Sequence, residues 1–295
     1  MRDARALTLV AGGRWFGHYG TAPCPICQPE RRSDQNALSL SEGSRGQLLA
    51  HCKKEGCKFA TIIAALGGDQ LTGRSPTSKE IERRIWEERL TAERNGAFAA
   101  RIWGEAIPIL GTPGETYLRR RGITCDIPTT LRFHPNCWHR AIGKGHPAMI
   151  ARVERGCGVA IHRTWLAADG SSKASVNPPR AMLGALAGGA VRLVDGREGL
   201  AVAEGVETAL SLASGLLAAP VSIWAALSAS GLASLELPEE VGTLIVATDG
   251  DSAGTSSGQK LAERASRLGW KVSMLPAAEG TDWNDVLQAG LGASL

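Results

Sequence analysis

Four acidic residues near the C-terminal end of the sequence stand just after short apolar runs. They are Glu204, Asp249, Asp251 and Asp282. Carboxylates that are held close together repel one another unless a cation lies among them. Hard oxygen ligands with room for water suit Mg²⁺, or Mn²⁺ in its place. The spacing therefore predicts a metal site for phosphate chemistry.

Each of these acids needs a strand that brings it to the others. Residues 200–203, 243–248 and 270–275 are apolar runs that fit buried parallel strands, and helix-forming segments follow them. In an open α/β sheet, ligands bind at the edge where the carboxyl ends of the strands meet. We therefore expect the acids to converge in one crevice. Glu207 and Asp285, each one turn from a main metal ligand, are expected to assist them.

Two cysteine pairs predict a zinc site near the N-terminus. The candidate ligands are Cys24, Cys27, Cys52 and Cys57. Between the pairs, residues 36–40 and 47–51 have the pattern of two paired strands, so the stretch has the outline of a zinc ribbon. The seven cysteines are an odd number, and four of them cluster, which favours metal binding in a reducing compartment over a disulfide framework.

The acidic pattern resembles the Toprim domain of bacterial and phage primases, topoisomerases and some nucleases. The resemblance rests on a Glu-Gly strand end at 204–205, an Asp-x-Asp strand end at 249–251 and an acidic cluster at 282–285. The cysteines are similar to the primase zinc-binding domain, except that the second pair is Cys-x4-Cys. That spacing leaves the third ligand open between His51 and Cys52. From the resemblance we expect Cys52, because neighbouring residues of a strand point to opposite faces.

The middle of the chain also resembles primases. Residues 117–123, Tyr-Leu-Arg-Arg-Arg-Gly-Ile, look like the segment that opens the primase catalytic core. Residues 148–184 are similar to a strand pair followed by a lysine and an Asn-x-Pro turn. In the family, basic residues of these segments face nucleotide and template. The resemblance implies a catalytic role for Lys173, and nucleotide or DNA contacts for Arg163, Arg180, Lys144, Arg119, Arg120 and Arg121.

The expected fold is α/β, with a zinc ribbon followed by a mixed α/β core that ends in a mostly parallel sheet. Four ranges are expected: a zinc-binding domain (1–67), a linker and amphipathic helix (68–106), the first half of a primase core (107–197) and a Toprim domain (198–295). The net charge is +4. Positive charge prevails over residues 1–197 taken together and negative charge over residues 198–295, which suits a protein that holds a polyanion and metal cations.

No run is long and apolar enough to span a membrane, and the first residues lack the pattern of a secretory signal. We therefore expect a cytoplasmic protein without a membrane partner. The sequence has no Walker-type Gly-Lys-Ser/Thr motif, so a separate replicative helicase is the expected partner. By analogy, this suits a primase of a mobile element.

Together these residues predict a DNA primase that copies single-stranded DNA into short RNA primers from ribonucleoside triphosphates. Its cofactors would be one structural Zn²⁺ and catalytic Mg²⁺ or Mn²⁺. One alternative is a Toprim-type metal-dependent nuclease, and another is a non-catalytic DNA-binding replication accessory protein. A topoisomerase is disfavoured, because only Tyr19 and Tyr117 are available as nucleophiles and neither lies in a plausible catalytic segment.

Overall fold

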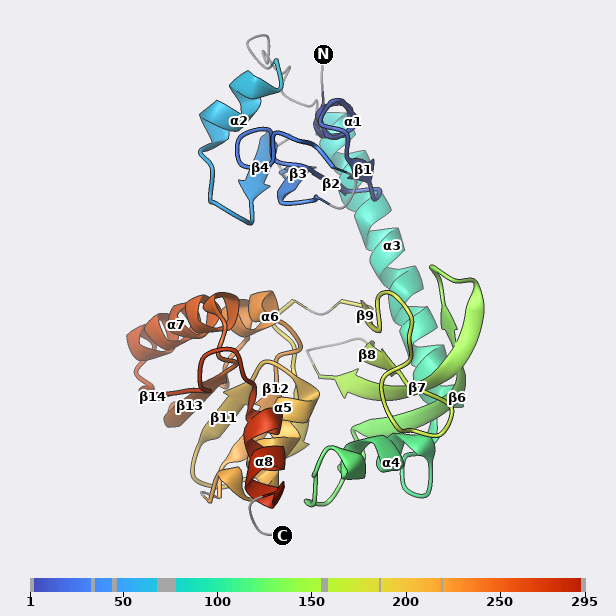
Figure 1. Cartoon of the computed structure of the whole chain (residues 1–295), viewed down its shortest axis with the longest axis vertical. Helices are drawn as coiled ribbons and strands as arrows, with labels where there is room; N and C mark the ends of the chain where they lie inside the picture. The colour runs from blue at the N-terminus through green and yellow to red at the C-terminus, as the bar shows by residue number, and fades with distance from the viewer. Residues whose placement is uncertain are drawn as a thin grey trace. The chain divides into compact units, whose positions relative to one another are not determined.

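The chain builds three β-sheets, which belong to two compact units (Figure 1). The computed structural model describes residues 3–32, 35–43, 47–67, 78–154, 159–185, 187–218 and 220–292. Unit 1 comprises residues 1–90 and unit 2 residues 91–295. Residues 68–77, where the predicted linker begins, lie outside the described residues.

Unit 1 contains a small antiparallel sheet in the order β1-β2-β3-β4. Its elements are β1 (Arg14–Trp15), β2 (Tyr19–Ala22), β3 (Leu38–Glu42) and β4 (Leu48–Cys52), with helices α1 (Ala4–Val10) and α2 (Phe59–Ala65). Strand β3 alternates buried and partly exposed residues, so that Leu38 and Leu40 enter a core with Leu7 and Ile62. The predicted strand pair is confirmed, because β3 and β4 form an antiparallel hairpin.

A long helix, α3 (Ser78–Glu105), crosses the boundary between the two units. The charged, amphipathic pattern after residue 78 predicts a helix, and the structure confirms it. Within unit 2, Ala99 and Ile102 of this helix are buried against Ile150 and Ile161 of the first sheet. The last turns of α3 therefore cover one face of that sheet.

The first sheet of unit 2 is antiparallel throughout and has the order β5-β6-β7-β8-β9. Its strands are β5 (Ile107–Pro108), β6 (Leu131–His139), β7 (Lys144–Val153), β8 (Ala160–Trp165) and β9 (Arg180–Leu183). Along β7, Ala148 and Ile150 join the core beneath α3, whereas Met149 and Ala151 join a second core on the other face. Helix α4 (Pro113–Arg120) also contributes to that second core, through Tyr117 and Leu118.

The second sheet of unit 2 is mostly parallel and has the order β10-β12-β11-β13-β14. Its strands are β10 (Val191–Val194), β11 (Leu200–Ala203), β12 (Ser222–Ala225), β13 (Thr243–Thr248) and β14 (Lys271–Pro276). Only the edge strand β10 runs antiparallel to its neighbour. The predicted fold class is confirmed, although β10 lies within the range that the sequence assigned to the preceding half.

Helices cover both faces of the parallel sheet. One face packs on α5 (Val206–Ser211), its continuation η1 (Leu212–Leu216) and α8 (Trp283–Gly292); the other packs on α6 (Ala229–Ser234) and α7 (Ser252–Arg267). Helix α7 comes close to β13 at Gly258, where an added Cβ would lie 2.4 Å from Thr248 Cγ2. A glycine is therefore required at this contact.

A single hydrophobic core joins the two sheets of unit 2. It contains Phe133 and Met149 from the antiparallel sheet together with Ala201, Ala203 and Leu210 from the parallel sheet and its helix. Because apolar burial is the main favourable term in folding, this shared core fixes the two sheets against each other.

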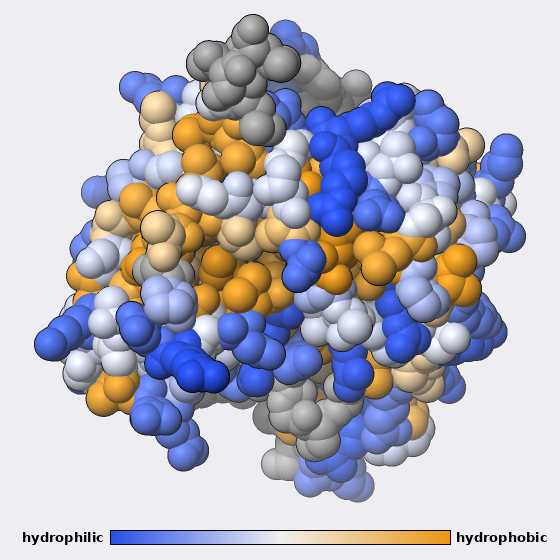
Figure 2. Space-filling view, turned by 90° about the horizontal axis from the view of Figure 1, so that it is seen from below, coloured by the Kyte–Doolittle hydropathy of each residue, from blue (hydrophilic) through white to orange (hydrophobic). Residues whose placement is uncertain are grey.

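None of the helices in the described part of the chain combines the length and the apolar character that crossing a membrane requires. Figure 2 shows hydrophobic side chains gathered across the middle of one face, with hydrophilic side chains around and between them.

Candidate active site

The four predicted zinc ligands of unit 1 lie together. Cys24 and Cys27 follow β2, Cys52 ends β4, and Cys57 precedes α2. One sulfur atom from each lies within 4.8 Å of the other three, and the Sγ atoms of Cys27 and Cys52 are 3.5 Å apart. His51 is exposed and does not belong to this group. The third position of the cluster is therefore Cys52, as expected from the strand alternation.

The electrostatics of the cluster suit a metal ion. Burial by itself would raise the pKa of Cys52, but backbone N–H groups of Glu55, Cys57 and Lys54 lower it to about 6. Burial and the neighbouring thiols raise the pKa of Cys27 to about 12. Four crowded sulfurs that share one stabilised thiolate are a donor set for a thiophilic cation, and the arrangement fits a structural Zn²⁺.

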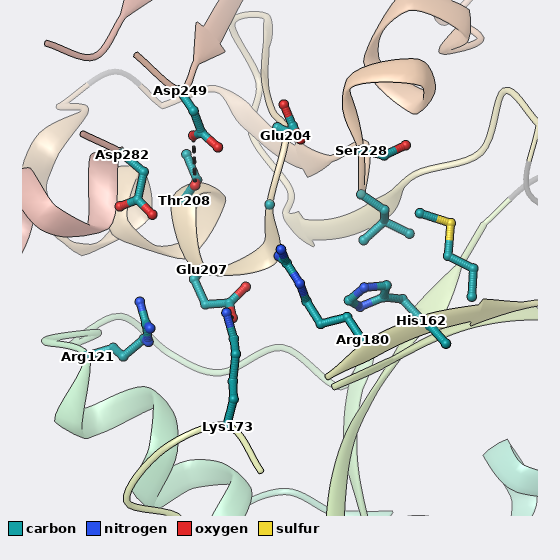
Figure 3. A pocket seen from close by; sticks show the side chains of 14 residues that line it. Arg121, His162, Lys173, Arg180, Glu204, Glu207, Thr208, Ser228, Asp249 and Asp282 are labelled. Carbon is teal, nitrogen blue, oxygen red and sulfur yellow. Dashed lines mark hydrogen bonds and ion pairs between the residues drawn. The ribbon is translucent and has the colours of Figure 1, made fainter. Parts of the chain in front are cut away.

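In unit 2, three of the four predicted acids line one cavity of about 390 Å³. Glu204 follows β11, Asp249 follows β13, and Asp282 stands between β14 and α8. They meet because the parallel strands end at the same edge of the sheet. Figure 3 shows Asp249 and Asp282 on one side of this cavity, with Glu204 between them and Ser228.

Hydrogen bonds hold the acidic side chains in place. Asp249 Oδ1 accepts a bond from Thr208 Oγ1 at 3.3 Å. Asp282 and Asp285 cap the start of α8 reciprocally: Asp282 Oδ1 accepts from the Asp285 N–H at 2.8 Å, and Asp285 Oδ2 accepts from the Asp282 N–H at 3.1 Å. Asp251 caps α7 by accepting from the Gly254 N–H at 2.6 Å. It is exposed and does not line the cavity.

The carboxylates lie close enough to repel one another, so each makes ionisation of its neighbours less favourable. Burial, followed by the charges of Asp249 and Asp251, raises the pKa of Glu204. Burial and the charge of Asp282 raise the pKa of Asp249. Within the described residues, neither carboxylate forms an ion pair with a basic side chain. Such partly buried, uncompensated oxygens fit a divalent cation.

Basic residues form the opposite wall of the cavity. Lys173, Arg180 and Arg121 line it together with the acids, and Figure 3 shows their side chains facing the acidic edge. Arg121 Nη1 donates to Asn284 Oδ1 at 2.8 Å. The buried Asn284 in turn donates to Ser211 Oγ at 2.9 Å and to the Arg121 carbonyl. Arg121 is thus held against α8 rather than free in solvent.

Glu207 anchors Lys173. Its carboxylate is buried, lies 3.0 Å from Lys173 Nζ and accepts a 2.7 Å hydrogen bond from the Tyr117 hydroxyl. Burial alone would raise the pKa of Glu207, but the Lys173 ammonium and the Tyr117 hydroxyl lower it to about 2. Glu207 is therefore a charged group in the wall of the cavity that is bound to Lys173, and it is not positioned as a free metal ligand.

Replacing Glu207 by glutamine is expected to destabilise the protein at pH 7 by about 3 kcal/mol, because the Lys173 ammonium loses its buried partner. A carboxylate with a lowered pKa stabilises the fold above its unfolded pKa, near 4.5, and loses that contribution as pH falls toward 2. The gap between wild type and variant should therefore shrink in acid. Denaturant unfolding at several pH values measures it.

The matched control is Glu154→Gln, which removes a half-exposed ion pair with Arg192. This change should cost less than about 1 kcal/mol. An equal loss in both variants, or a Glu207→Gln gap that is independent of pH, would contradict the anchoring role.

Several predicted contact residues are not brought to the cavity. Arg163 is buried and lies over the Trp165 ring at 5.0 Å. Lys144 begins β7 and is exposed outside the cavity. Arg119 pairs with Glu115 and donates to two backbone carbonyls, and Arg120 is exposed. Of the three consecutive arginines, only Arg121 lines the cavity.

The sequence interpretation missed other residues of the cavity. His162, Thr208 and Ser228 line it, and Asn284 orients Arg121. His162 lies one position before Arg163 on β8, where successive side chains point to opposite faces. The family resemblance indicated the correct strand, but every residue of β8 is buried. No alternation of polar and apolar residues could therefore identify the face that meets the cavity.

Two family models match the chain. Residues 93–193 match a domain of unknown function, DUF7146. Residues 199–293 match the Toprim domain. Among curated proteins, no sequence matches the chain significantly.

Solved primase structures resemble the chain at low identity. A DNA primase domain from Pseudomonas aeruginosa is 16% identical, with a TM-score of 0.42 over 66% of this chain and 74% of that one. The Aquifex aeolicus primase, with its zinc-binding and RNA polymerase domains, is 13% identical (TM-score 0.39, covering 94% and 77%). The primase fragment of the bacteriophage T7 primase-helicase protein is also 13% identical (TM-score 0.38, covering 92% and 96%).

Proposed function

We propose that this chain, whose residues 199–293 form a Toprim domain, is a DNA primase that joins ribonucleotides on a single-stranded DNA template. The observation that carries the proposal is the cavity of unit 2. Glu204, Asp249 and Asp282 lie on one side of it, and Lys173 and Arg180 lie on the other. Opposed acidic and basic walls suit a nucleoside triphosphate, whose phosphates need cations on every side.

The carboxylates would hold the catalytic cations. Glu204 and Asp249 are partly buried, and their pKa values are raised. Asp282 completes the set from the adjacent strand end, and Asp251 adds charge from the start of α7. Bound Mg²⁺ or Mn²⁺ would neutralise phosphate charge and make the attacking 3′-hydroxyl more acidic.

The remaining side chains have roles that follow from their positions. Lys173 and Arg180 would bind the phosphates, and Arg121 would hold the end nearest Asp282. Glu207 keeps Lys173 oriented, since the two are ion-paired. As an alternative to binding a cation, Glu204 would accept the proton of the attacking hydroxyl, since its raised pKa makes it a better proton acceptor than an unperturbed carboxylate. Arg163 has no part in this arrangement, because it is buried away from the cavity.

Unit 1 supports template binding. Phe16 and Tyr19 are both about half exposed and stack on each other with ring centroids 5.4 Å apart. Lys53 and Lys54 are exposed next to Cys52. Aromatic faces beside positive charge are the surface that single-stranded nucleic acid prefers. We assign template reading to residues 1–67, with the zinc cluster as their structural support. We further propose that a helicase on a separate polypeptide acts together with this chain.

The test is incorporation of labelled ribonucleotides on single-stranded DNA with Mg²⁺, comparing wild type with Asp249→Ala/Asp251→Ala. Short RNA products that disappear in the double variant are the expected result. Magnesium-dependent loss of template without synthesis would replace the proposal with a nuclease. DNA binding without synthesis or cleavage, with and without added helicase, would favour an accessory protein.

A further inference from the structure

One wall residue of the cavity has an unused hydrogen-bonding atom. His162 is 5% exposed, and its Nδ1 has no hydrogen-bond partner among the described residues. Burial, together with the charges of Arg180, Lys173 and Arg163, lowers its pKa to about 4, against the opposing effect of Glu207. The ring is therefore neutral at pH 7. The Nδ1 atom is itself buried, so a ligand in the cavity would meet the exposed part of the ring that lines the cavity rather than this atom.

The surroundings of His162 differ from the rest of the cavity. Met182 lies opposite His162 in the register of β8 and β9, and both line the cavity. Leu227 and Ser228 line it from the segment after β12. Leu227 adopts a φ of +71°, a conformation that is uncommon for a large side chain and that persists only when the surrounding structure imposes it.

The cavity therefore has two chemically distinct ends. Figure 3 shows Asp249, Asp282 and Arg121 at one end and His162 and Ser228 at the other, with Glu204 and Arg180 between them. The first end is charged. The second combines the apolar side chains of Met182 and Leu227 with two neutral hydrogen-bonding groups. We call this second end, made of His162, Met182, Leu227 and Ser228, the neutral end.

We propose that the neutral end binds the nucleoside part of the nucleotide, and that His162 is its hydrogen-bonding contact. The inference rests on the proposed function, which puts the phosphates at the charged end. A nucleoside has apolar faces and neutral polar edges, so it matches the neutral end and would leave the charged end uncompensated. A neutral imidazole can both donate and accept a hydrogen bond, which suits a sugar hydroxyl or a base edge.

The test compares the binding of ATP and of inorganic tripolyphosphate to the full chain by calorimetry in the presence of Mg²⁺. Tripolyphosphate can occupy only the charged end. In His162→Leu, the affinity for ATP should fall about three- to tenfold, the effect of one lost hydrogen bond, while the affinity for tripolyphosphate stays unchanged. His162→Gln, which retains a polar group, should recover part of the loss.

The control variant is His134→Leu. His134 is a buried histidine of the same sheet that contacts Glu105 and does not line the cavity. Both affinities should be unchanged in it. A ribose 5′-triphosphate without a base then separates the two sources of the contact: sensitivity to His162→Leu that persists indicates the sugar, and sensitivity that disappears indicates the base.

Two results would overturn the inference. The first is an ATP affinity that does not change in His162→Leu. The second is an equal loss for ATP and tripolyphosphate, which would indicate a structural role for His162. A wild-type protein that binds neither compound would instead overturn the proposed function, so the two failures can be told apart.

Discussion

Replacing Asp249 by asparagine is expected to lower primer synthesis by at least about 10²-fold, the scale on which a group that stabilises developing charge contributes. The same change should raise the melting temperature of the metal-free protein at pH 7. Burial and the neighbouring Asp282 raise the pKa of Asp249, so its charged form is less favourable in the folded state than in the unfolded state. The asparagine lacks that charge but keeps the shape of the side chain.

The sign of this effect gives a pH signature. A carboxyl whose pKa is raised stabilises the fold while it is protonated, and this contribution disappears as pH rises through the folded pKa. The variant should therefore melt higher than wild type at pH 7 and equal to it near pH 3. A rise of about 2–4 °C is expected for each kcal/mol of relieved repulsion in a unit of this size. Differential scanning calorimetry in EDTA measures it.

Added Mg²⁺ should reverse the order of the two melting temperatures. The cation stabilises the wild type by mass action, whereas the variant has lost a ligand and gains less. Glu263→Gln removes an exposed carboxylate of α7 that contacts only Gln259 among the described hydrogen bonds. This control should change neither melting temperature nor synthesis. A metal-free Asp249→Asn protein that melts below wild type at pH 7 would show that the acids do not repel one another.

Replacing Cys52 by serine is expected to abolish zinc binding and to unfold the hairpin of β3 and β4. The core of unit 1 is small, and Cys24 and Cys52 are part of it. Structural zinc contributes about 10–16 kcal/mol of apparent binding free energy in small domains. A module of this size cannot replace that contribution with other contacts. Zinc content by atomic absorption and protection of residues 3–67 from protease are the measurements.

The adjacent His51 provides the matched control. It is exposed, and its backbone pairs with Ser39. His51→Ser should retain a full equivalent of zinc and the protease resistance of wild type. Zinc loss in His51→Ser together with zinc retention in Cys52→Ser would show that His51, and not Cys52, is the zinc ligand. Unit 2 should keep its own melting transition in both variants.

The acidic edge of the site could be predicted from the sequence because Glu204 and Asp249 directly follow apolar strands and Asp282 follows the next strand after a short loop. Parallel strands end at one edge, so the positions of Glu204, Asp249 and Asp282 relative to one another depend only on local pattern and sheet topology. The cysteine cluster was predictable for a similar reason, since spacing and turn residues determine it. Asp251 shows the limit of this reasoning, because it caps α7 instead of lining the cavity.

The basic wall could not be predicted residue by residue. Of three consecutive arginines, packing against α8 brings Arg121 inward, and no local rule distinguishes it from Arg119. On β8, burial of both faces removes the alternation that would have favoured His162 over Arg163. Tyr117 and Glu207 are 90 positions apart in the chain, so their hydrogen bond exists only as a result of the tertiary fold.

The shared core of unit 2 limits how the two halves could be exchanged between relatives. Phe133 and Met149 from one half pack in the same cluster as Ala201 and Leu210 from the other, and β10 precedes the Toprim match yet completes its sheet. A chimaera that takes residues up to about 193 from one protein and residues from 199 onward from a relative would pair β10 with strands of another sequence. Recombination that preserves activity should instead transfer residues 91–295 as one block.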